Sequence, residues 1–150
     1  MDQLNNHILQ LVESTPYLGV TLTKDLTWSK HIGIINSKAN STLGLIRRNL
    51  AKCPHQCRKT AYTSLVRSTL QYASTVWDPY YEKDIQALER TQRKAARFIT
   101  GDYHSRESGC MTRMLKELEL STLQQRRKED RLCLLYKISR GLVPAIPKTD

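Results

Sequence analysis

The stretch "WSKHIGIINSKANSTLGLIRRNL", residues 28–50, decides the fold class of this chain. Its apolar residues recur at steps of three and four, which is the period of an α-helix. They are Trp28, Ile32, Ile35, Ala39, Leu43, Ile46 and Leu50. At about 100° per residue they fall within an arc of roughly 80°, so they form one narrow stripe that needs a core to pack against. The stretch therefore predicts a first long helix over residues 28–50.

The same period predicts two more helices directly downstream. The second covers residues 54–76, with Pro54 in its first turn. Its apolar face would consist of Tyr62, Leu65, Val66, Thr69, Ala73 and Val76. The third covers residues 79–100, with Asp78 as its N-cap and Gly101 just past its end. Its apolar face would consist of Tyr81, Ile85, Leu88, Ala95, Ala96 and Ile99.

Two shorter patterns complete the helical part. A fourth helix is predicted over residues 109–118. A fifth is predicted over residues 122–140, with Ser121 and Gln124 forming a capping box and Gly141 ending it. The run "LCLLYKI" in its second half is apolar nearly all round, so we expect that half to be buried. Residues 142–150 read as an extended tail.

The N-terminal part is different in character. "HILQLVE" (7–13) and "YLGVTL" (17–22) are short, apolar and β-branched, so they predict two strands, with Gly19 marking a bulge or a close backbone approach. A two-stranded ribbon is marginal alone and needs either helices to lie on or a sheet that is missing here. The predicted fold is mainly α, about five helices in a bundle, preceded by a short two-stranded β ribbon.

Charge is unevenly distributed along the chain. The 150 residues contain 24 Lys+Arg and 14 Asp+Glu, a net charge of +10. Residues 1–26 contain one lysine and three acidic residues, so the whole excess lies in the predicted helices. Such a balance favours a polyanionic partner, most often nucleic acid, and the alternative is a surface charged for solubility.

The composition also predicts where the protein works. No stretch approaches the ~18 apolar residues of a membrane span. The start "MDQLNNHILQ" lacks the basic and apolar regions of a secretory signal. We therefore expect no membrane partner, and an intracellular protein of the cytoplasm, the nucleus or both. Its cysteines, Cys53, Cys57, Cys110 and Cys133, are then expected to be reduced thiols.

Motifs for catalysis are missing from the sequence. There is no phosphate-binding glycine loop, no G-x-S-x-G elbow and no Asp-Asp pair. "CPHQC" brings Cys53, His55 and Cys57 together, but tetrahedral zinc wants a second ligand pair at matching spacing, so we interpret the cysteines as small buried thiols. Glu129 and Asp130 are predicted to pair with arginines on their own helix. The sequence predicts no catalytic residue, no metal site and no cofactor.

Basic residues instead gather in three clusters, and guanidinium groups match phosphate geometry well. The third helix would carry a cationic ridge of Arg90, Arg93, Lys94 and Arg97, all within roughly 100° of arc. The other clusters are Arg126, Arg127, Lys128 and Arg131, and Arg47 with Arg48. The alternative for each cluster is a solvated helix face. Phe98 and Tyr103 lie near the ridge and are candidates to stack on bases, with core packing the alternative for Phe98.

Four strings resemble a known family: "YLGVTLTKDLTWSKHI", "AYTSLVRSTLQYASTVWDPY", "IQALERTQRKAARFITGDY" and "LELSTLQQRRKEDRLCLLYKISRGLV". They are similar to the C-terminal part of the reverse transcriptase of non-LTR (LINE-type) retrotransposons, of the jockey and chicken-repeat kind. The resemblance covers about residues 12–150, and "YASTVWDPY" is its most specific piece.

The resemblance implies a division of the chain and a partner. Residues 1–26 would be a remnant of the polymerase palm, with Tyr17, Leu18, Gly19 and Val20 as a primer-grip-like strand. Residues 27–150 would be the thumb and the adjoining C-terminal region. In that family these helices hold the template–primer duplex, so the implied partner is nucleic acid, either an RNA–DNA duplex or RNA.

The chain departs from the family at the catalytic motif. The family uses an aromatic-Ala-Asp-Asp turn and an upstream Asp to bind two magnesium ions, and neither is present here. Because Met1 lies shortly before the strand, we expect a truncated copy or a fragment that is not an enzyme by itself. The alternative is a structural or interaction protein that self-associates through the face left by the missing palm.

Overall fold

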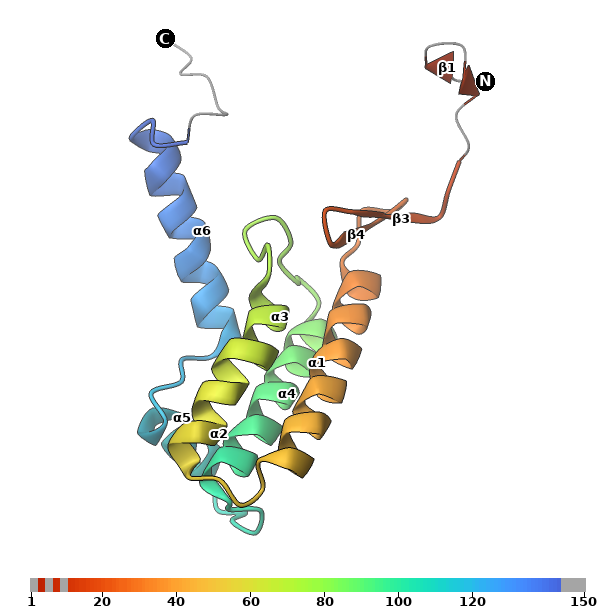
Figure 1. Cartoon of the computed structure of the whole chain (residues 1–150). Helices are drawn as coiled ribbons and strands as arrows, with labels where there is room; N and C mark the ends of the chain where they lie inside the picture. The colour runs from red at the N-terminus through yellow and green to blue at the C-terminus, as the bar shows by residue number, and fades with distance from the viewer. Residues whose placement is uncertain (1–2, 5–6, 9–10, 144–150) are drawn as a thin grey trace.

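The structure is a computed structural model that describes residues 3–4, 7–8 and 11–143. It is mainly α-helical, with helices gathered in a bundle and short antiparallel strands ahead of them, as predicted (Figure 1). The strands are β1 (Gln3–Leu4), β2 (His7–Ile8), β3 (Ser14–Tyr17) and β4 (Val20–Thr23). The helices are α1 (Ser29–Asn49), α2 (His55–Ala61), the π-helix η1 (Tyr62–Arg67), α3 (Ser68–Gln71), α4 (Glu82–Thr100), α5 (Cys110–Glu117) and α6 (Leu123–Ser139).

Helix α1 confirms the prediction from its apolar period. Its bounds differ from residues 28–50 by one residue at each end. The middle of the stripe is buried, namely Ile32, Ile35, Ala39, Leu43 and Ile46. The ends of the stripe, Trp28 and Leu50, are half-buried and pack against the same core.

Helix α4 is the centre of the bundle and contacts α1, α2, α5 and α6. Its buried apolar residues are Leu88, Ala95, Ala96, Phe98 and Ile99. Polar residues are buried beside them, and the Tyr62 hydroxyl donates to Gln92 Oε1 (2.9 Å) inside the core. Gly101 ends α4 with a φ of 76°, as predicted, and its N–H donates to the Arg97 carbonyl (2.9 Å).

The predicted start of α4 is wrong. The helix begins at Glu82, with Tyr81 in the N-cap position and exposed, so Asp78 does not cap it. The Asp78 carboxylate instead accepts from Arg127 Nε (3.3 Å) and pairs with Arg131 on α6. A charged partner from a distant helix therefore outcompetes the local capping role that the D-P dipeptide indicates.

The second predicted helix is present but differs in its face and its end. Helices α2, η1 and α3 follow without a break from His55 to Gln71, five residues short of the predicted end. The buried residues are Tyr62, Val66 and Leu70, whereas Leu65 and Val76 are exposed. Tyr62 and Val66 of the predicted face are thus confirmed. The i→i+5 bonding of the π-helix widens the turn, so the buried face continues to Leu70 and leaves Leu65 exposed.

The hairpin corrects the predicted strands. β3 and β4 pair antiparallel from Ser14↔Thr23 to Tyr17↔Val20, so Leu18 and Gly19 form the two-residue turn and Gly19 is not inside a strand. Both turn residues have positive φ (47° and 83°), as a type I′ turn requires. Gly19 is required for space as well, because a Cβ there would lie 3.0 Å from Tyr72 Cε1.

A chain of contacts attaches this hairpin to the bundle. The Tyr72 hydroxyl donates to the Leu18 carbonyl (3.0 Å), and Trp77 Nε1 donates to the Tyr72 carbonyl (2.8 Å). The buried Trp77 ring meets the His31 ring edge-on at 5.1 Å. His31 Nδ1 then accepts from the Thr21 N–H of β4 (3.2 Å). Hairpin, α1 and the loop after α3 are thereby one packed unit.

The start of α6 differs slightly from the predicted capping box. The cap is Thr122, whose hydroxyl accepts from the Gln125 N–H (3.1 Å), and not Ser121. The Gln124 N–H is accepted by Glu89 Oε1 of α4 (2.9 Å), which fixes the start of α6 to the core. At the other end Gly141 (φ 66°) terminates the helix as predicted, with Gly141 and Leu142 N–H groups returning to Ile138 and Lys137 carbonyls.

The second half of α6 is exposed, which reverses the predicted burial. Leu132, Leu135 and Tyr136 are 56%, 62% and 57% exposed. The buried residues are Leu123 and Arg127 in the first half, where the sequence looks most polar. The physical reason is the direction of the helix, which is held at its start and then runs away from the bundle past the end of α3 (Figure 1). Among the described residues no helix is long and apolar enough to cross a membrane.

The His31 contacts predict a pH-dependent stability. Burial lowers the pKa of His31 below its usual 6.5, so on acidification the unfolded chain takes up this proton before the folded one. The stabilisation is present above pH 6.5 and is lost as the pH falls below it, with a slope of at most about 1.4 kcal/mol per pH unit. Urea unfolding between pH 7.5 and 5.5 measures it.

The matched variants for this measurement are His31→Asn and His104→Gln. An asparagine carbonyl still accepts from the Thr21 N–H but does not titrate, so the pH profile is expected to flatten. His104 is exposed in the loop after α4, and its replacement is expected to leave the slope as it is. A profile that stays equally steep in His31→Asn contradicts the assignment.

Candidate nucleic-acid interface

The cationic ridge predicted on the third helix lies on α4, on the side away from the core. Arg90, Arg93 and Lys94 are exposed and Arg97 is half-buried. The buried residues of α4 cover roughly 180° of its circumference, and the ridge occupies part of the remainder. The ridge is therefore the surface strip that the central helix has left for solvent.

Three of the four ridge side chains, Arg90, Arg93 and Lys94, are not neutralised by an acidic partner within residues 11–143. Arg93 Nη2 donates to Gln86 Oε1 (3.0 Å) and Lys94 Nζ donates to Asn40 Oδ1 (3.3 Å), both neutral acceptors. Within residues 11–143 neither of them nor Arg90 forms an ion pair. Arg97 has a structural task, since it donates to the carbonyls of Asp102 (3.2 Å) and Ser105 (3.0 Å) and so holds the following loop.

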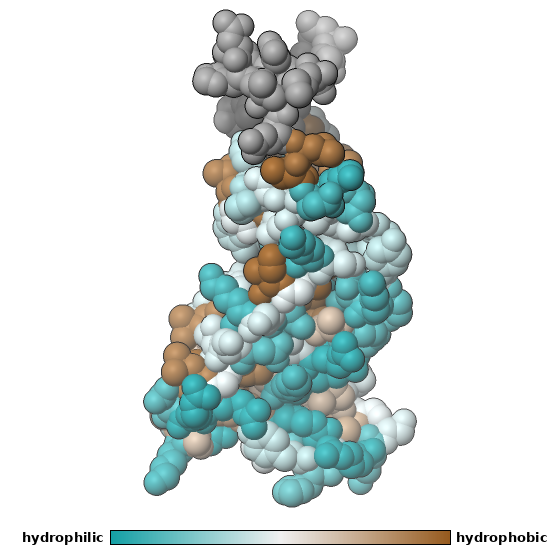
Figure 2. Space-filling view, turned by 90° about the vertical axis from the view of Figure 1, so that its right-hand side faces the viewer, coloured by the Kyte–Doolittle hydropathy of each residue, from teal (hydrophilic) through white to brown (hydrophobic). Residues whose placement is uncertain are grey.

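Helix α1 lies beside α4 and runs in the same direction. The Ser29 hydroxyl bonds Asp84 near the start of both helices, Asn40 Nδ2 donates to Thr91 Oγ1 (3.0 Å) midway, and Arg47 stands over the Tyr103 ring just beyond the end of α4 (5.6 Å). Helix α1 contains no acidic residue. Helices α1 and α4 therefore present a face without exposed carboxylates after the first turn of α4. Hydrophilic side chains cover most of the molecule on the α1 side (Figure 2).

The structure brings the Arg47–Arg48 cluster to the end of this face. Both residues are exposed at the C-terminus of α1 and line an open pocket of about 540 Å³ with Arg58 and Tyr103. Sequence reasoning missed Arg58, which lies on α2 outside the three predicted clusters. Its Nη1 donates to the Phe98 carbonyl (3.1 Å) and its Nη2 to the Ala51 carbonyl (2.6 Å), so only the packing of α2 on α4 reveals it.

Phe98 and Tyr103, the two candidates for stacking on bases, lie in different environments. Phe98 is 2% exposed and belongs to the core, which was the alternative considered for it. Tyr103 is 40% exposed and lies at the pocket, so part of its ring faces solvent. Only Tyr103 is placed to stack on a base.

The cluster on α6 does not act as one surface. Arg127, predicted as a nucleic-acid contact, is 0% exposed and paired with Asp78, and its two Nη atoms have no partner within the described residues. Burial lowers the pKa of its guanidinium, against the opposing effect of Asp78. Arg131 shares Asp78 and Arg126 is half-buried, which leaves Lys128 as the exposed member without an ion pair in residues 11–143. The helix turns its middle arginine inward because the loop before α4 supplies the carboxylate.

The predicted pairing of Glu129 and Asp130 with arginines on their own helix is wrong. Within the described part of the chain Glu129 and Asp130 form no ion pair. Asp130 accepts from the Ser74 hydroxyl (2.8 Å), and Glu129 accepts from Gln125 Nε2 (2.9 Å). Asp130 thus helps Asp78 to hold α6 to the loop after α3.

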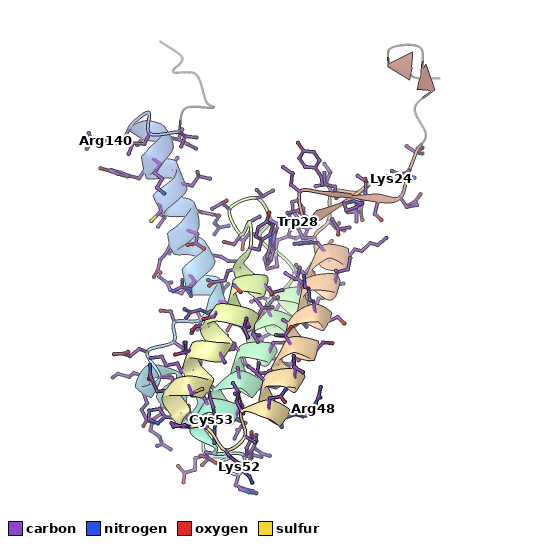
Figure 3. All side chains as sticks on the ribbon, viewed as in Figure 1. Lys24, Trp28, Arg48, Lys52, Cys53 and Arg140 are labelled. Carbon is purple, nitrogen blue, oxygen red and sulfur yellow. The ribbon has the colours of Figure 1, made fainter. Side chains whose placement is uncertain are left out.

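The predicted primer-grip-like residues lie at the other end of the bundle. Tyr17 and Leu18 are exposed at the hairpin tip (65% and 75%), whereas Val20 is buried in the core. In Figure 3 Lys24 of the hairpin region and Arg48 mark opposite ends of α1. Of these four residues, the structure therefore offers Tyr17, Leu18 and Gly19 to a partner and withholds Val20.

The cysteines are free thiols, but not all are buried. Cys110 is buried and Cys53 half-buried, whereas Cys57 and Cys133 are exposed, contrary to the expectation of buried thiols at this helix start. Desolvation and the neighbouring Cys53 thiol raise the pKa of Cys57. In residues 11–143 no group of three or more His, Cys, Asp or Glu side chains is placed to hold a metal ion.

Comparison with known proteins adds one finding. The chain is 27% identical over 88 residues to a probable RNA-directed DNA polymerase from transposon X-element of Drosophila melanogaster. The match covers 57% of this chain and 10% of that protein. No family model matches. No solved structure matches. The similarity supports a region related to a transposon reverse transcriptase.

Substitutions of Arg127 and Lys128 test which basic side chains of α6 stabilise the fold. Arg127→Ala is expected to lower the free energy of unfolding by about 2 to 3 kcal/mol, because it removes a buried side chain and one partner of Asp78. Lys128→Ala, its exposed neighbour, is expected to change it by less than about 0.5 kcal/mol. Urea unfolding measures both. A stable Arg127→Ala variant with weakened nucleic-acid binding would restore Arg127 as a contact residue.

Proposed function

We propose that this chain is a fragment of a non-LTR retrotransposon reverse transcriptase that binds template–primer nucleic acid through α1 and α4. The observation that carries the proposal is the ridge of Arg90, Arg93 and Lys94, exposed and free of ion pairs within residues 11–143. The relative in Drosophila melanogaster is described as an RNA-directed DNA polymerase, and such an enzyme must hold a nucleic-acid duplex.

The two parts of the chain take different roles in this proposal. Residues 27–150 correspond to the thumb and the region after it, and residues 1–26 to the end of the palm. The exposed hairpin tip, Tyr17 and Leu18, is the primer-grip-like element. The α4 ridge, with Lys94 at the seam to α1, follows the phosphate backbone of an RNA–DNA duplex or of structured RNA. A convex helix face with several exposed cationic side chains suits such a regular backbone.

The fragment binds without catalysing polymerisation. Two-metal phosphoryl transfer needs clustered carboxylates, and the sequence has no Asp-Asp pair. Asp25 is held by Thr27 in a local turn, and Asp78 and Asp84 are engaged by Arg127 and Ser29. These acidic side chains are already committed to the fold, so we infer no cofactor requirement for the chain.

The ridge is tested by the salt dependence of binding to a labelled RNA–DNA primer–template. The logarithm of the association constant should fall linearly with the logarithm of salt concentration, with about 0.7 to 0.9 in slope for each phosphate contacted. The triple variant Arg90→Ala, Arg93→Ala, Lys94→Ala is expected to reduce that slope by about 2. Fluorescence anisotropy provides the measurement.

The control removes the same charge from other surfaces. Lys38→Ala, Lys116→Ala and Lys137→Ala lie on α1, α5 and α6, all exposed. Lys38 is on the side of α1 opposite to Asn40, two residues away. This variant should keep the wild-type slope. Equal slopes in the two triple variants would mean a diffuse charge effect, and no binding at low salt by the folded protein would end the proposal.

A second candidate function is a non-catalytic interaction protein that associates with itself. The observation in its favour is the exposed apolar half of α6. Sedimentation velocity over a range of concentrations should then show a dimer that Leu132→Gln with Leu135→Gln converts to monomer. Leu45→Gln on α1, 52% exposed, is the matched control. A wild-type protein that stays monomeric at all concentrations rejects this candidate.

A further inference from the structure

The pocket lined by Arg47, Arg48, Arg58 and Tyr103, here called the arginine pocket, differs from the ridge in shape and in surroundings. It is an open concavity of about 540 Å³ where α1 ends and α2 begins, beside the end of α4. The ridge is a convex helix face. Figure 3 places Arg48 at this end of the bundle, away from the hairpin region marked by Lys24.

The pocket concentrates positive charge without a counter-charge. No acidic residue lines it. Within residues 11–143 none of its three arginines forms an ion pair. Arg58 is fixed by two backbone carbonyls and by the Phe98 ring beneath its guanidinium (5.5 Å). Its charge is therefore held in place before any ligand arrives, which reduces the ordering cost of binding an anion.

The other two arginines are arranged around the aromatic side chain and a glycine. The Arg47 guanidinium lies 5.6 Å from the centre of the Tyr103 ring. Arg48 Nη1 lies 3.6 Å from where a Cβ on Gly44 would be, so the absent side chain at Gly44 keeps the pocket open beside Arg48. One guanidinium over an aromatic ring, with a second arginine lining the same pocket, matches a phosphate next to a base.

We propose that the arginine pocket binds one unpaired nucleotide of a single-stranded extension beside the duplex, with its phosphate at Arg47 and Arg48 and its base against Tyr103. This rests on the proposed function and names the part of the nucleic acid that the pocket takes. A base inside a duplex must be unpaired and unstacked before it can enter a concavity, whereas an unpaired base can be splayed out and stacked on an aromatic side chain without that cost. The volume lies in the range of small-ligand sites, which suits one nucleotide and excludes a duplex.

The test compares two labelled RNA–DNA hybrids, one blunt and one with a four-nucleotide single-stranded extension, by fluorescence anisotropy. The readout is the ratio of their affinities for the same protein. The wild-type chain is expected to bind the extended hybrid about tenfold more tightly, as one base stacked on an aromatic ring provides. Because it is a ratio, it is insensitive to changes in the strength of duplex binding.

Gly44→Leu is the main variant, with Gly33→Leu as its matched control. Leucine at position 44 fills the pocket, keeps every charge and raises helix propensity, so the fold should be retained. Gly33 lies on the same helix, and a Cβ there would meet no atom within 4 Å. Gly44→Leu and Tyr103→Leu are expected to reduce the ratio to about one, and Gly33→Leu to leave it at the wild-type value.

Two outcomes would overturn the proposal. The first is a wild-type ratio of one, and the second is a ratio that Gly44→Leu and Tyr103→Leu leave unchanged. Both are distinguishable from failure of the proposed function, in which the blunt hybrid itself shows no salt-dependent binding. Circular dichroism of each variant checks that a reduced affinity ratio is not caused by unfolding.

Discussion

The structure depends on the burial of α4 among the other helices. It is contacted by α1, α2, α5 and α6, so its apolar and polar residues alike are taken into the core over about half of its circumference. Gln92 shows how complete this burial is, since it accepts from Tyr62 and donates to the Ser121 carbonyl just before α6. A central helix so enclosed has one strip left for solvent, and that strip carries Arg90, Arg93 and Lys94.

The parallel arrangement of α1 and α4 orders the molecule from end to end. The hairpin is attached at the start of both helices through His31, Trp77 and Tyr72, and the arginine pocket lies where both helices finish. An extended ligand lying along this pair would meet the hairpin tip first, the ridge in the middle and the pocket last. In the proposed binding mode the duplex lies at the convex middle and unpaired nucleotides at the concave end.

The local errors of prediction have separate physical causes. The face of the second helix was predicted only in part, with Leu65 wrongly placed in it, because η1 departs from the 3.6-residue turn and nothing in "YTSLVR" signals this. The hairpin was misplaced by about three residues because a short apolar run does not show where its turn lies. A glycine after a bulky residue is compatible with a turn at that place. The second half of α6 was expected in the core because an apolar run indicates burial only if another element lies beside it.

The sequence by itself determined the helical class, the bounds of α1, and the glycine ends of α4 and α6, because periodicity and positive-φ termini are local properties. It also located the ridge, since four residues on one helix share a face whatever surrounds it. Only the tertiary structure decided which charges stay free. Arg127 is neutralised by Asp78, Arg97 is occupied by the loop after α4, and Arg58 becomes part of a pocket with Arg47 and Arg48. Those outcomes depend on partners from other segments, and no pattern within one helix encodes them.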